Sequence, residues 1–217
     1  MLGRLRDKTK KLAFMLAKPF AVLGVHPNIV SFLGIPLALV AGYFIYSGNY
    51  LLASIFALLA ITMDFIDGAV AELTKKKSYF GNYFETMMDK YVEMILLGSF
   101  VFVFPFESVF ALGFSLMESY AKPRVGLVII TDNRDWPAIG EHADKLSLII
   151  IGLLLASFVP AIFGIETLRI VLWLLIAMTI IGGVQRILYA KKLIEEAERK
   201  GKILPYLKKD AGHKAIE

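Results

Sequence analysis

The stretch DFIDGAVAELTKKKSYFGNYFETMMD, residues 64–89, begins in the last turns of one apolar run and ends inside the next. Four of its carboxylates, Asp64, Asp67, Glu85 and Asp89, lie at or near the depth of a membrane if those runs span one. A charged side chain at that depth opposes insertion, and four of them close together also repel one another. The stretch therefore predicts that positive charge compensates the four carboxylates.

Both halves of this stretch place their acidic and small residues at helical spacing. One face, at positions i, i+3, i+4 and i+7 of the first helix, holds Asp64, Asp67, Gly68 and Ala71. A second face repeats every four residues along the next helix, at Gly81, Glu85, Asp89 and Glu93. Because the loop between them is short, the two helices are expected to lie antiparallel, with both faces forming one pocket.

Divalent metal ions are the simplest compensation for such a pocket. Carboxylate oxygens without Cys or His ligands favour Mg²⁺, Mn²⁺ or Ca²⁺ over zinc, and the chain contains no Cys. The pocket has enough oxygens for two ions, and a two-metal site suits the transfer of a phosphoryl-type group. The alternatives are acidic residues that face headgroup water and an ion or proton relay of a transporter. The grouping of the carboxylates on two faces favours the metal site.

The composition of the whole chain is typical of an integral membrane protein. It has 217 residues, of which 57% are hydrophobic, and a mean hydropathy of +0.65. A bilayer-spanning helix needs roughly 20 apolar residues. Segments that qualify run over about 28–46, 50–71, 80–104, 109–130, 141–162 and 167–189. We therefore expect an all-α integral membrane protein with six transmembrane helices.

The basic residues orient these helices in the membrane. If the helices alternate in direction, the loops at 47–49, 105–108 and 163–166 share one side, and they contain no Lys or Arg. The opposite side holds both termini, the loops near 74–78 and 131–140, and nearly all of the 24 basic residues. The positive-inside rule then places both termini and the carboxylate pocket in the cytoplasm, at the cell membrane.

The two ends of the chain differ from the spans. Residues 1–20 interleave apolar side chains such as Leu12, Leu16 and Phe20 with Lys and Arg, which predicts an amphipathic helix on an anionic leaflet. A solvated basic tail is the alternative for this segment. We expect three parts: an amphipathic juxtamembrane helix at 1–20, a six-helix catalytic domain at 21–190, and a charged cytoplasmic tail at 191–217.

The opening stretch resembles the signature of the CDP-alcohol phosphotransferases, D-x2-D-G-x2-A-R-x8-G-x3-D-x3-D. Every spacing of that signature is kept between Asp64 and Asp89. Two positions depart from it, because Glu72 stands where the family has Arg and Glu85 where it has the third Asp. The segment VHPNIVSFLG at 25–34 also resembles the start of the family's first transmembrane helix.

The resemblance implies a membrane enzyme of phospholipid synthesis that transfers a substituted phosphate from a CDP-linked donor to an alcohol and releases CMP. It implies two divalent ions, Mg²⁺ or Mn²⁺, held by Asp64, Asp67, Glu85 and Asp89. Asp89 is also expected to be the general base. The nucleotide is expected against Asp64, Asp67, Gly68, Ala71 and Gly81. The resemblance further implies a homodimer, and no nucleic-acid partner is expected.

The substitution at Glu72 replaces a cation near the nucleotide phosphates with an anion. Lys75, Lys76 and Lys77 follow closely in the sequence and are candidates to supply the missing charge. Two other functions stay open beside the enzyme: a small ion or proton transporter, and a catalytically degenerate family member that binds nucleotide and metal.

A second group of cations lies on the same side of the membrane. The residues Lys122, Arg124, Lys145 and Arg186 are expected to form a phosphate pocket beside the metals. This favours a phosphorylated polyol, such as inositol phosphate or glycerol phosphate, as the acceptor. The alternatives are that Arg186 snorkels to the interface and that Lys122 and Arg124 pair with Glu118. His26 and His142 lack metal-ligand spacing and are expected to be structural.

Overall fold

The computed structural model describes residues 2–129, 136 and 138–204, and this part of the chain is almost entirely helical. Its α-helices are α1 (Leu2–Val22), α2 (Pro27–Tyr46), α3 (Tyr50–Leu73), α4 (Tyr79–Ser99), α5 (Pro105–Val125), α6 (His142–Phe158) and α7 (Thr167–Arg199). A short 3₁₀ helix, η1 (Phe100–Phe102), continues α4. The strands β1 (Ala161–Ile162) and β2 (Ile165–Glu166) form a small antiparallel hairpin, with Ala161 opposite Glu166.

The short polar breaks in the sequence set where these helices begin. Asn49 caps α3 by accepting a hydrogen bond from the Leu52 amide at 3.2 Å, and Ser78 caps α4 by accepting one from the Gly81 amide at 2.9 Å. Pro105 occupies the first turn of α5, where its missing N–H is not needed. These caps explain why the helices lie close to the six predicted segments.

The helix ends nevertheless differ from several predicted boundaries. The predicted span 80–104 is divided between α4 and η1, and the predicted span 109–130 begins four residues earlier, at Pro105, and ends at Val125. The last predicted span, 167–189, continues as one helix to Arg199, because the charged sequence after Tyr189 has no helix-breaking residue before Gly201.

Small residues let the first spans of the bundle approach closely. Ala41 of α2 and Ala57 of α3 are completely buried, and both belong to the main apolar core together with Leu96, Leu153 and Leu172 of the later helices. Helix α3 packs against α1, α2 and α6, while α5 packs mainly along α7. Close helix contacts through small side chains are typical of membrane bundles.

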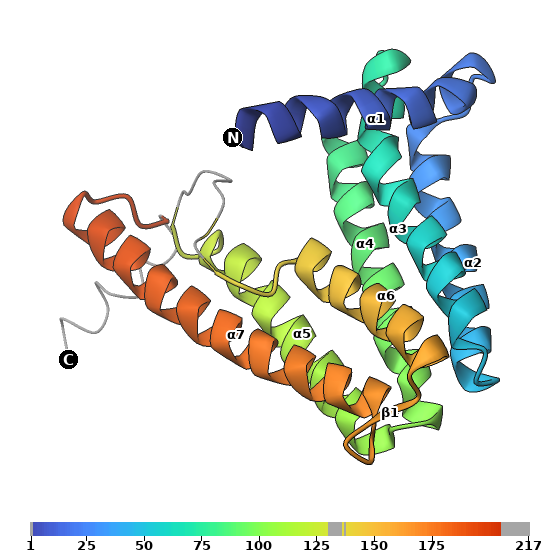
Figure 1. Cartoon of the computed structure of the whole chain (residues 1–217). Helices are drawn as coiled ribbons and strands as arrows, with labels where there is room; N and C mark the ends of the chain where they lie inside the picture. The colour runs from blue at the N-terminus through green and yellow to red at the C-terminus, as the bar shows by residue number, and fades with distance from the viewer. Residues whose placement is uncertain (1, 130–135, 137, 205–217) are drawn as a thin grey trace.

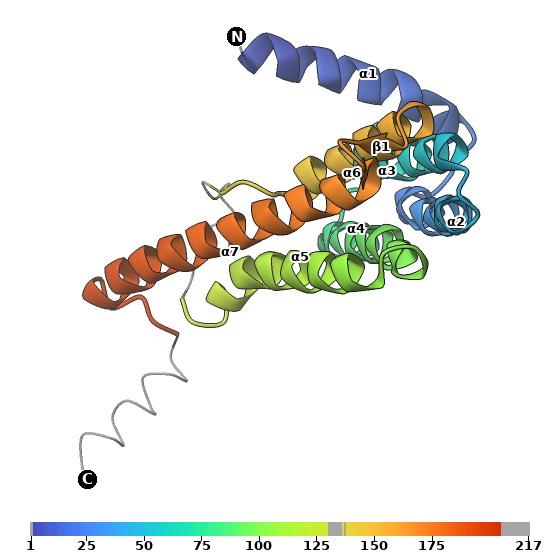
Figure 2. The ribbon, with the colours of Figure 1, turned by 60° about the horizontal axis from the view of Figure 1, so that its bottom comes forward.

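The connections alternate between two ends of the bundle (Figure 1). The turn at 47–49, the connection after η1 and the β1–β2 hairpin all lie at the end away from α1. Helix α1 lies across the opposite end, close to the connection between α3 and α4 (Figures 1 and 2). The loops without Lys or Arg therefore share one end, and the α3–α4 loop with its three lysines lies at the other.

Three helices of the described residues, α2, α3 and α7, are long and apolar enough to cross a membrane by length and composition alone. Helix α6 has 17 residues. Helices α4 and α5 carry several charges each, among them Glu85, Asp89, Glu118 and Lys122. The charges that lower the hydropathy of these helices include those of the candidate site. The three apolar helices support a membrane protein, but they do not by themselves give its number of spans.

Candidate active site

The four carboxylates of the opening stretch lie together in the structure. Single oxygens of Asp64, Asp67 and Glu85 lie within 4.8 Å of one another. A second group with the same spacing joins Asp64 and Asp89 to a ring nitrogen of His142. Asp64 belongs to both groups, so α3 and α4 present one continuous cluster, which we call the carboxylate cluster (Asp64, Asp67, Glu85, Asp89).

Asp67 is the most deeply buried member of the carboxylate cluster. It is 2% exposed, and its Oδ2 accepts a hydrogen bond from the Ser31 hydroxyl of α2. Its Oδ1 is buried and has no hydrogen-bond partner among the described residues. A buried carboxylate oxygen without a donor is unfavourable unless a cation meets it. The oxygen ligands of the carboxylate cluster and the orphaned atom therefore fit a hard divalent ion such as Mg²⁺ or Mn²⁺.

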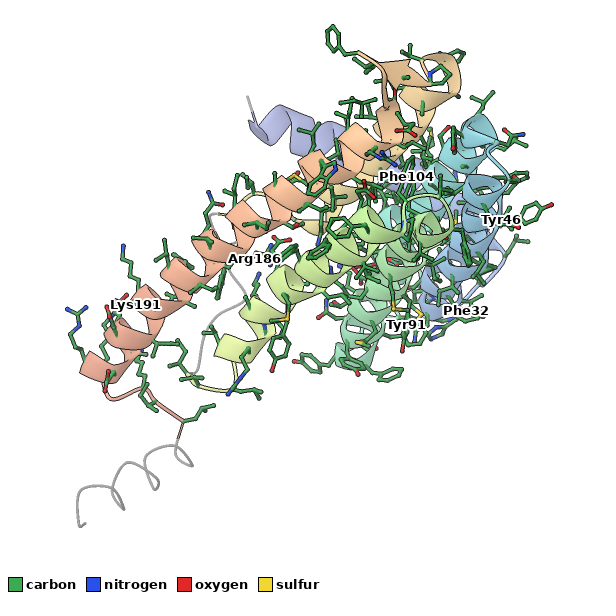
Figure 3. All side chains as sticks on the ribbon, turned by 90° about the horizontal axis from the view of Figure 1, so that it is seen from below. Phe32, Tyr46, Tyr91, Phe104, Arg186 and Lys191 are labelled. Carbon is green, nitrogen blue, oxygen red and sulfur yellow. The ribbon has the colours of Figure 1, made fainter. Side chains whose placement is uncertain are left out.

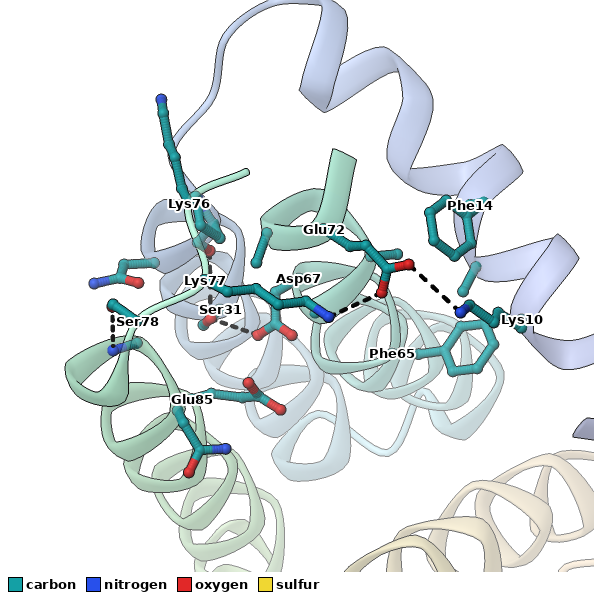
Figure 4. A pocket seen from close by; sticks show the side chains of 18 residues that line it. Lys10, Phe14, Ser31, Phe65, Asp67, Glu72, Lys76, Lys77, Ser78 and Glu85 are labelled. Atoms are coloured by element: carbon teal, nitrogen blue, oxygen red, sulfur yellow. Dashed lines mark hydrogen bonds and ion pairs between the residues drawn. The ribbon is translucent and has the colours of Figure 1, made fainter. Parts of the chain in front are cut away.

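A cavity of about 450 Å³ opens on one side of the carboxylate cluster, between α1, α2, α3 and α4 (Figure 4). We call it the motif cavity, because its lining includes Asp67, Gly68, Ala71, Gly81 and Glu85. A Cβ on Gly68 would meet no protein atom within 4 Å beyond the adjacent turns of its own helix. Packing within the protein therefore does not require glycine there, and the missing side chain leaves room for a ligand.

Glu72 also lines the motif cavity, and it is held by two lysines. Its Oε2 lies 2.9 Å from Nζ of Lys77, and its Oε1 lies 3.4 Å from Nζ of Lys10 on α1. Lys76 lines the cavity as well, whereas Lys75 is exposed outside its described lining. Two of the three lysines proposed from the sequence therefore reach this cavity, and Lys10 is an additional cation that the sequence did not suggest.

A second cavity, of about 740 Å³, lies among α4, α5 and α7 and the start of α6. We call it the basic cavity, because Lys90, Lys122, His142 and Arg186 line it together with polar groups such as Ser119. Two of the four predicted acceptor cations, Lys122 and Arg186, therefore share one cavity. Arg186 points from α7 toward α5 (Figure 3), where its Nη1 donates to the Glu118 carbonyl oxygen at 3.2 Å.

The other two predicted acceptor cations lie elsewhere. Lys145 is 1% exposed, and its Nζ pairs with Glu93 at 2.7 Å and with Glu118 at 3.4 Å. Arg124 is exposed in the last turn of α5 and is absent from the described lining of the basic cavity. The predicted alternative partner of Lys122 and Arg124, Glu118, instead pairs with Lys145 and Arg186.

A cluster of buried charges lies beside the basic cavity. Glu93 is fully buried and accepts contacts from Lys145 at 2.7 Å, Lys90 at 2.8 Å and Nδ1 of His142 at 2.7 Å, besides the Ser115 hydroxyl. An ion that is buried without partners destabilises a protein strongly, so these contacts keep the charges tolerable. The fifth acidic residue of the predicted faces thus binds cations instead of joining the carboxylate cluster.

His142 has no partner at metal-ligand spacing in the sequence and was expected to be structural, but the structure places it beside the carboxylate cluster. It touches Glu93 on one side and lies with Asp64 and Asp89 on the other. His142 is the first residue of α6 and lies inside a capping box formed by Glu141 and Asp144. Such a cap fixes the orientation of the first helical residue.

The segment before α6 is held against α7 by a close backbone contact. A Cβ on Gly182 would lie 2.1 Å from the carbonyl oxygen of Ile139, so only glycine permits this approach. The amide of Ile139 donates to Oε1 of Gln185 at 2.9 Å. Gly140 follows with φ +83° and turns the chain into α6. These contacts set where His142 enters the site.

Comparison with known proteins finds a matching family model and relatives that are named as enzymes of the same kind. The family model for CDP-alcohol phosphatidyltransferase matches residues 24–181, which is more than half of the chain. Archaetidylinositol phosphate synthase of Pyrococcus horikoshii is 29% identical over 203 residues, covering 90% of this chain and 99% of that protein. Phosphatidylinositol phosphate synthase of Streptomyces avermitilis is 25% identical over 203 residues, covering 83% and 80%.

Solved structures show the same fold. Phosphatidylinositol phosphate synthase of Mycobacterium tuberculosis with CDP-DAG bound superposes with a TM-score of 0.68 at 18% identity, covering 83% of this chain and 94% of that one. The same enzyme in complex with manganese and citrate also gives 0.68 at 18% identity, covering 82% and 88%. At this identity the likeness concerns the arrangement of the helices alone.

Proposed function

This chain belongs to the CDP-alcohol phosphatidyltransferase family, and we propose that it transfers a substituted phosphate from a CDP-linked lipid to the hydroxyl of a phosphorylated polyol, such as inositol phosphate or glycerol phosphate, with release of CMP. One observation carries the proposal. The carboxylate cluster lies between two cavities: Asp67 and Glu85 line the motif cavity, and His142, which groups with Asp64 and Asp89, lines the basic cavity. A donor and an acceptor can therefore meet at the carboxylate cluster.

The motif cavity suits the CDP part of the donor. Gly68 and Ala71 of α3 and Gly81 of α4 contribute only small side chains to its lining, and Asp67 lies beside Ser31 (Figure 4). The relative that was solved with CDP-DAG and the inositol phosphate synthases support a CDP-lipid donor. We assign nucleotide binding to Asp64, Asp67, Gly68, Ala71 and Gly81.

We assign two divalent ions, Mg²⁺ or Mn²⁺, to Asp64, Asp67, Glu85 and Asp89. When bound, such ions neutralise the diphosphate oxygens and stabilise the leaving group. Ser31 orients the Asp67 carboxylate toward this position through its hydrogen bond. The longer side chain of Glu85 still brings an oxygen within 4.8 Å of Asp64 and Asp67, so the change from Asp keeps a ligand there.

Asp89 is proposed as the general base. It lies with Asp64 and with His142, and His142 forms part of the basic-cavity wall, so an acceptor hydroxyl that enters from this cavity can reach Asp89 beside His142. The hydroxyl oxygen forms a bond to the donor phosphorus next to the lipid, the bond from that phosphorus to CMP breaks, and the hydroxyl proton passes to Asp89. A base must lie within hydrogen-bond reach of the proton that it removes.

The basic cavity suits an acceptor that itself carries a phosphate. Lys122 and Arg186 line it, and Lys90 adds a cation. Arg186 is only 7% exposed, so its side chain is buried within the protein and does not snorkel to the membrane interface. We also assign Lys145 and Arg124 to phosphate binding, Lys145 by way of its ion pairs next to the cavity and Arg124 at the end of α5. Lys122 and Arg186 have the more direct support, because both line the basic cavity.

For the membrane arrangement we propose six spanning helices, α2 to α7, with α1 lying at the interface. Both termini and the carboxylate cluster are assigned to the cytoplasmic side of the cell membrane, because the basic loops share that end. The proposed parts are residues 1–20 as the juxtamembrane helix, 21–190 as the catalytic domain and 191–217 as a cytoplasmic tail. A homodimer is proposed from the family.

The test is CMP release by the purified protein in detergent, with CDP-archaeol or CDP-diacylglycerol, Mg²⁺ or Mn²⁺, and inositol 1-phosphate, glycerol 3-phosphate, serine or inositol in turn. We expect release that depends on metal and on one phosphorylated acceptor. Asp89→Asn should lower the rate by at least about 100-fold, within the usual range for loss of a general base. Glu195→Gln, which removes an exposed carboxylate on α7, is the matched control. If none of these four acceptors supports CMP release, the proposed reaction is refuted.

A further inference from the structure

Glu72 is a carboxylate placed where an anionic donor would be repelled. It lines the motif cavity beside Gly68 and Ala71, on the side where the family signature has a cation. A solitary Glu at this place would weaken the binding of a diphosphate. The structure shows that Glu72 is not solitary, because Lys10 and Lys77 contact one oxygen each.

The two lysines come from different elements and converge on Glu72 (Figure 4). Lys77 lies in the connection between α3 and α4 and donates to Oε2 at 2.9 Å. Lys10 reaches Oε1 from α1, at 3.4 Å. We call these three residues the lysine clamp (Lys10, Glu72, Lys77). With two positive charges and one negative charge it carries a net +1, which equals the charge of the single Arg in the family signature.

The position of Lys10 is set by the packing of α1. Ala13 and Ala17 of α1 are buried in an apolar cluster with Ile66, Ala69 and Val70 of α3 and with Val30 of α2. Because Ala13 lies within one helical turn of Lys10, a shift of α1 along α3 that displaced Lys10 would also break this contact. Lys10 Nζ also lies 5.4 Å from the centre of the Phe14 ring, which keeps its side chain over the cavity.

We propose that Glu72 is a positioning residue, which holds Lys10 and Lys77 at the mouth of the motif cavity so that both ammonium groups contact the diphosphate of a CDP-linked donor. This inference rests on the proposed function. It makes α1 part of the donor site in addition to a membrane contact. A Lys ammonium has three donors, so each lysine can bind Glu72 and a phosphate oxygen together.

The proposal predicts the sign of a binding change. If Glu72 were only an unfavourable charge, Glu72→Gln would strengthen the binding of an anionic nucleotide. If it positions the lysines, the same substitution weakens binding, because two long side chains lose their anchor and regain rotamer freedom. Charge-assisted contacts of this kind correspond to about tenfold in affinity.

The experiment measures the equilibrium binding of CDP with Mg²⁺ to the full-length protein in detergent, by calorimetry, together with KM and kcat for a CDP-lipid. We expect Glu72→Gln, Lys10→Gln and Lys77→Gln each to raise Kd and KM by about tenfold, with kcat within about twofold. The double variant Lys10→Gln/Glu72→Gln should cost less affinity than the product of the two single effects, because the residues act through one another.

The chain offers a matched control for each lysine. Lys11 is the exposed neighbour of Lys10 on α1, and Lys75 is an exposed lysine of the same loop as Lys77. Neither belongs to the described lining of the motif cavity. Lys11→Gln and Lys75→Gln remove the same charge and should leave Kd for CDP within about twofold. A general electrostatic effect would make controls and clamp variants alike, which would overturn the proposal.

Other outcomes separate this inference from the proposed function. Unchanged or tighter CDP binding by Glu72→Gln, with wild-type turnover intact, overturns the lysine clamp alone. Binding changes as expected without CMP release from any donor would refute the reaction and leave the clamp as a nucleotide-phosphate site. If Glu72→Gln does not fold, Lys77→Gln in the exposed loop decides the question. Failure of the wild-type protein to bind CDP overturns both.

Discussion

Ser31 shows how one residue outside the signature shapes the site. It belongs to α2, 36 positions away from its partner Asp67, yet its hydroxyl donates to Oδ2 of that carboxylate. The bond leaves Oδ1, the buried oxygen without a partner among the described residues, as the atom available to a cation. Residues that orient metal ligands in this way are often as important as the ligands.

We expect Ser31→Ala to weaken the binding of Mn²⁺ or Mg²⁺ by about 10- to 100-fold, because the Asp67 carboxylate loses its orientation. The measurements are the metal concentration that gives half-maximal CMP release and direct Mn²⁺ binding by electron paramagnetic resonance. Ser54→Ala is the control, since Ser54 is also buried in this bundle and its hydroxyl donates only to the Leu51 carbonyl in the described structure. Equal metal dependence in both variants would contradict the role of Ser31.

At the scale of elements, the contact between α7 and the segment before α6 decides where His142 lies. Gly182 and Gly183 are neighbours on α7 but face different surroundings. A Cβ on Gly182 would meet the Ile139 carbonyl at 2.1 Å, whereas a Cβ on Gly183 would meet nothing within 4 Å. The adjacent pair therefore offers a test in which composition and helix position are nearly constant.

Gly182→Ala is expected to displace the backbone around Ile139 and to lower the free energy of unfolding by about 1–3 kcal/mol, the usual effect of overpacking. The rate of CMP release should fall by more than the loss of folded protein explains, because His142 and Glu141 move with this segment. Gly183→Ala should be neutral or slightly stabilising, since alanine favours a helix. Thermal unfolding and CMP release of the two variants check this, and indistinguishable behaviour would argue against the contact.

At the scale of the whole molecule, the two ends of the bundle differ in charge. The end that carries α1 also carries the α3–α4 loop with Lys75, Lys76 and Lys77. The other end carries the β1–β2 hairpin, whose Phe163 is fully exposed at the turn. By the positive-inside rule, the end with the lysines is expected to face the cytoplasm and the hairpin end the opposite side.

The absence of Cys from the chain makes the orientation directly measurable. We expect Phe163→Cys to react with a membrane-impermeant maleimide added to intact cells. Lys75→Cys should react only after the membrane is opened, because the basic end faces the cytoplasm. The wild-type protein is the unlabelled control. The reverse pattern would invert the proposed topology, and labelling of both from outside would mean that an even number of spans separates them, which contradicts the three proposed for α4, α5 and α6.

The sequence alone was sufficient to predict the family and with it a CDP-alcohol phosphotransferase of the metal-dependent kind, and the family model confirms this prediction. It also predicted segments that overlap α2 to α7, because apolar runs and their polar breaks are local features, although α7 extends ten residues beyond its predicted end at 189. The signature brought Asp64, Asp67, Glu85 and Asp89 together at helical spacing, and the structure places them within one cluster. The roles given to these residues stay predictions until they are tested.

The partners of the charges were decided only by the tertiary structure. Lys145, which is proposed at a phosphate, lies buried between Glu93 and Glu118. Glu72, for which only lysines of the following loop were expected as cations, is held by Lys77 of that loop and also by Lys10 of α1. Most of these partners come from helices far apart in the chain, and hydrophobic periodicity says which face of a helix is polar without saying which helix it meets. The helices and the signature thus follow from local sequence. The pairing of charges and the two cavities depend on how the helices pack.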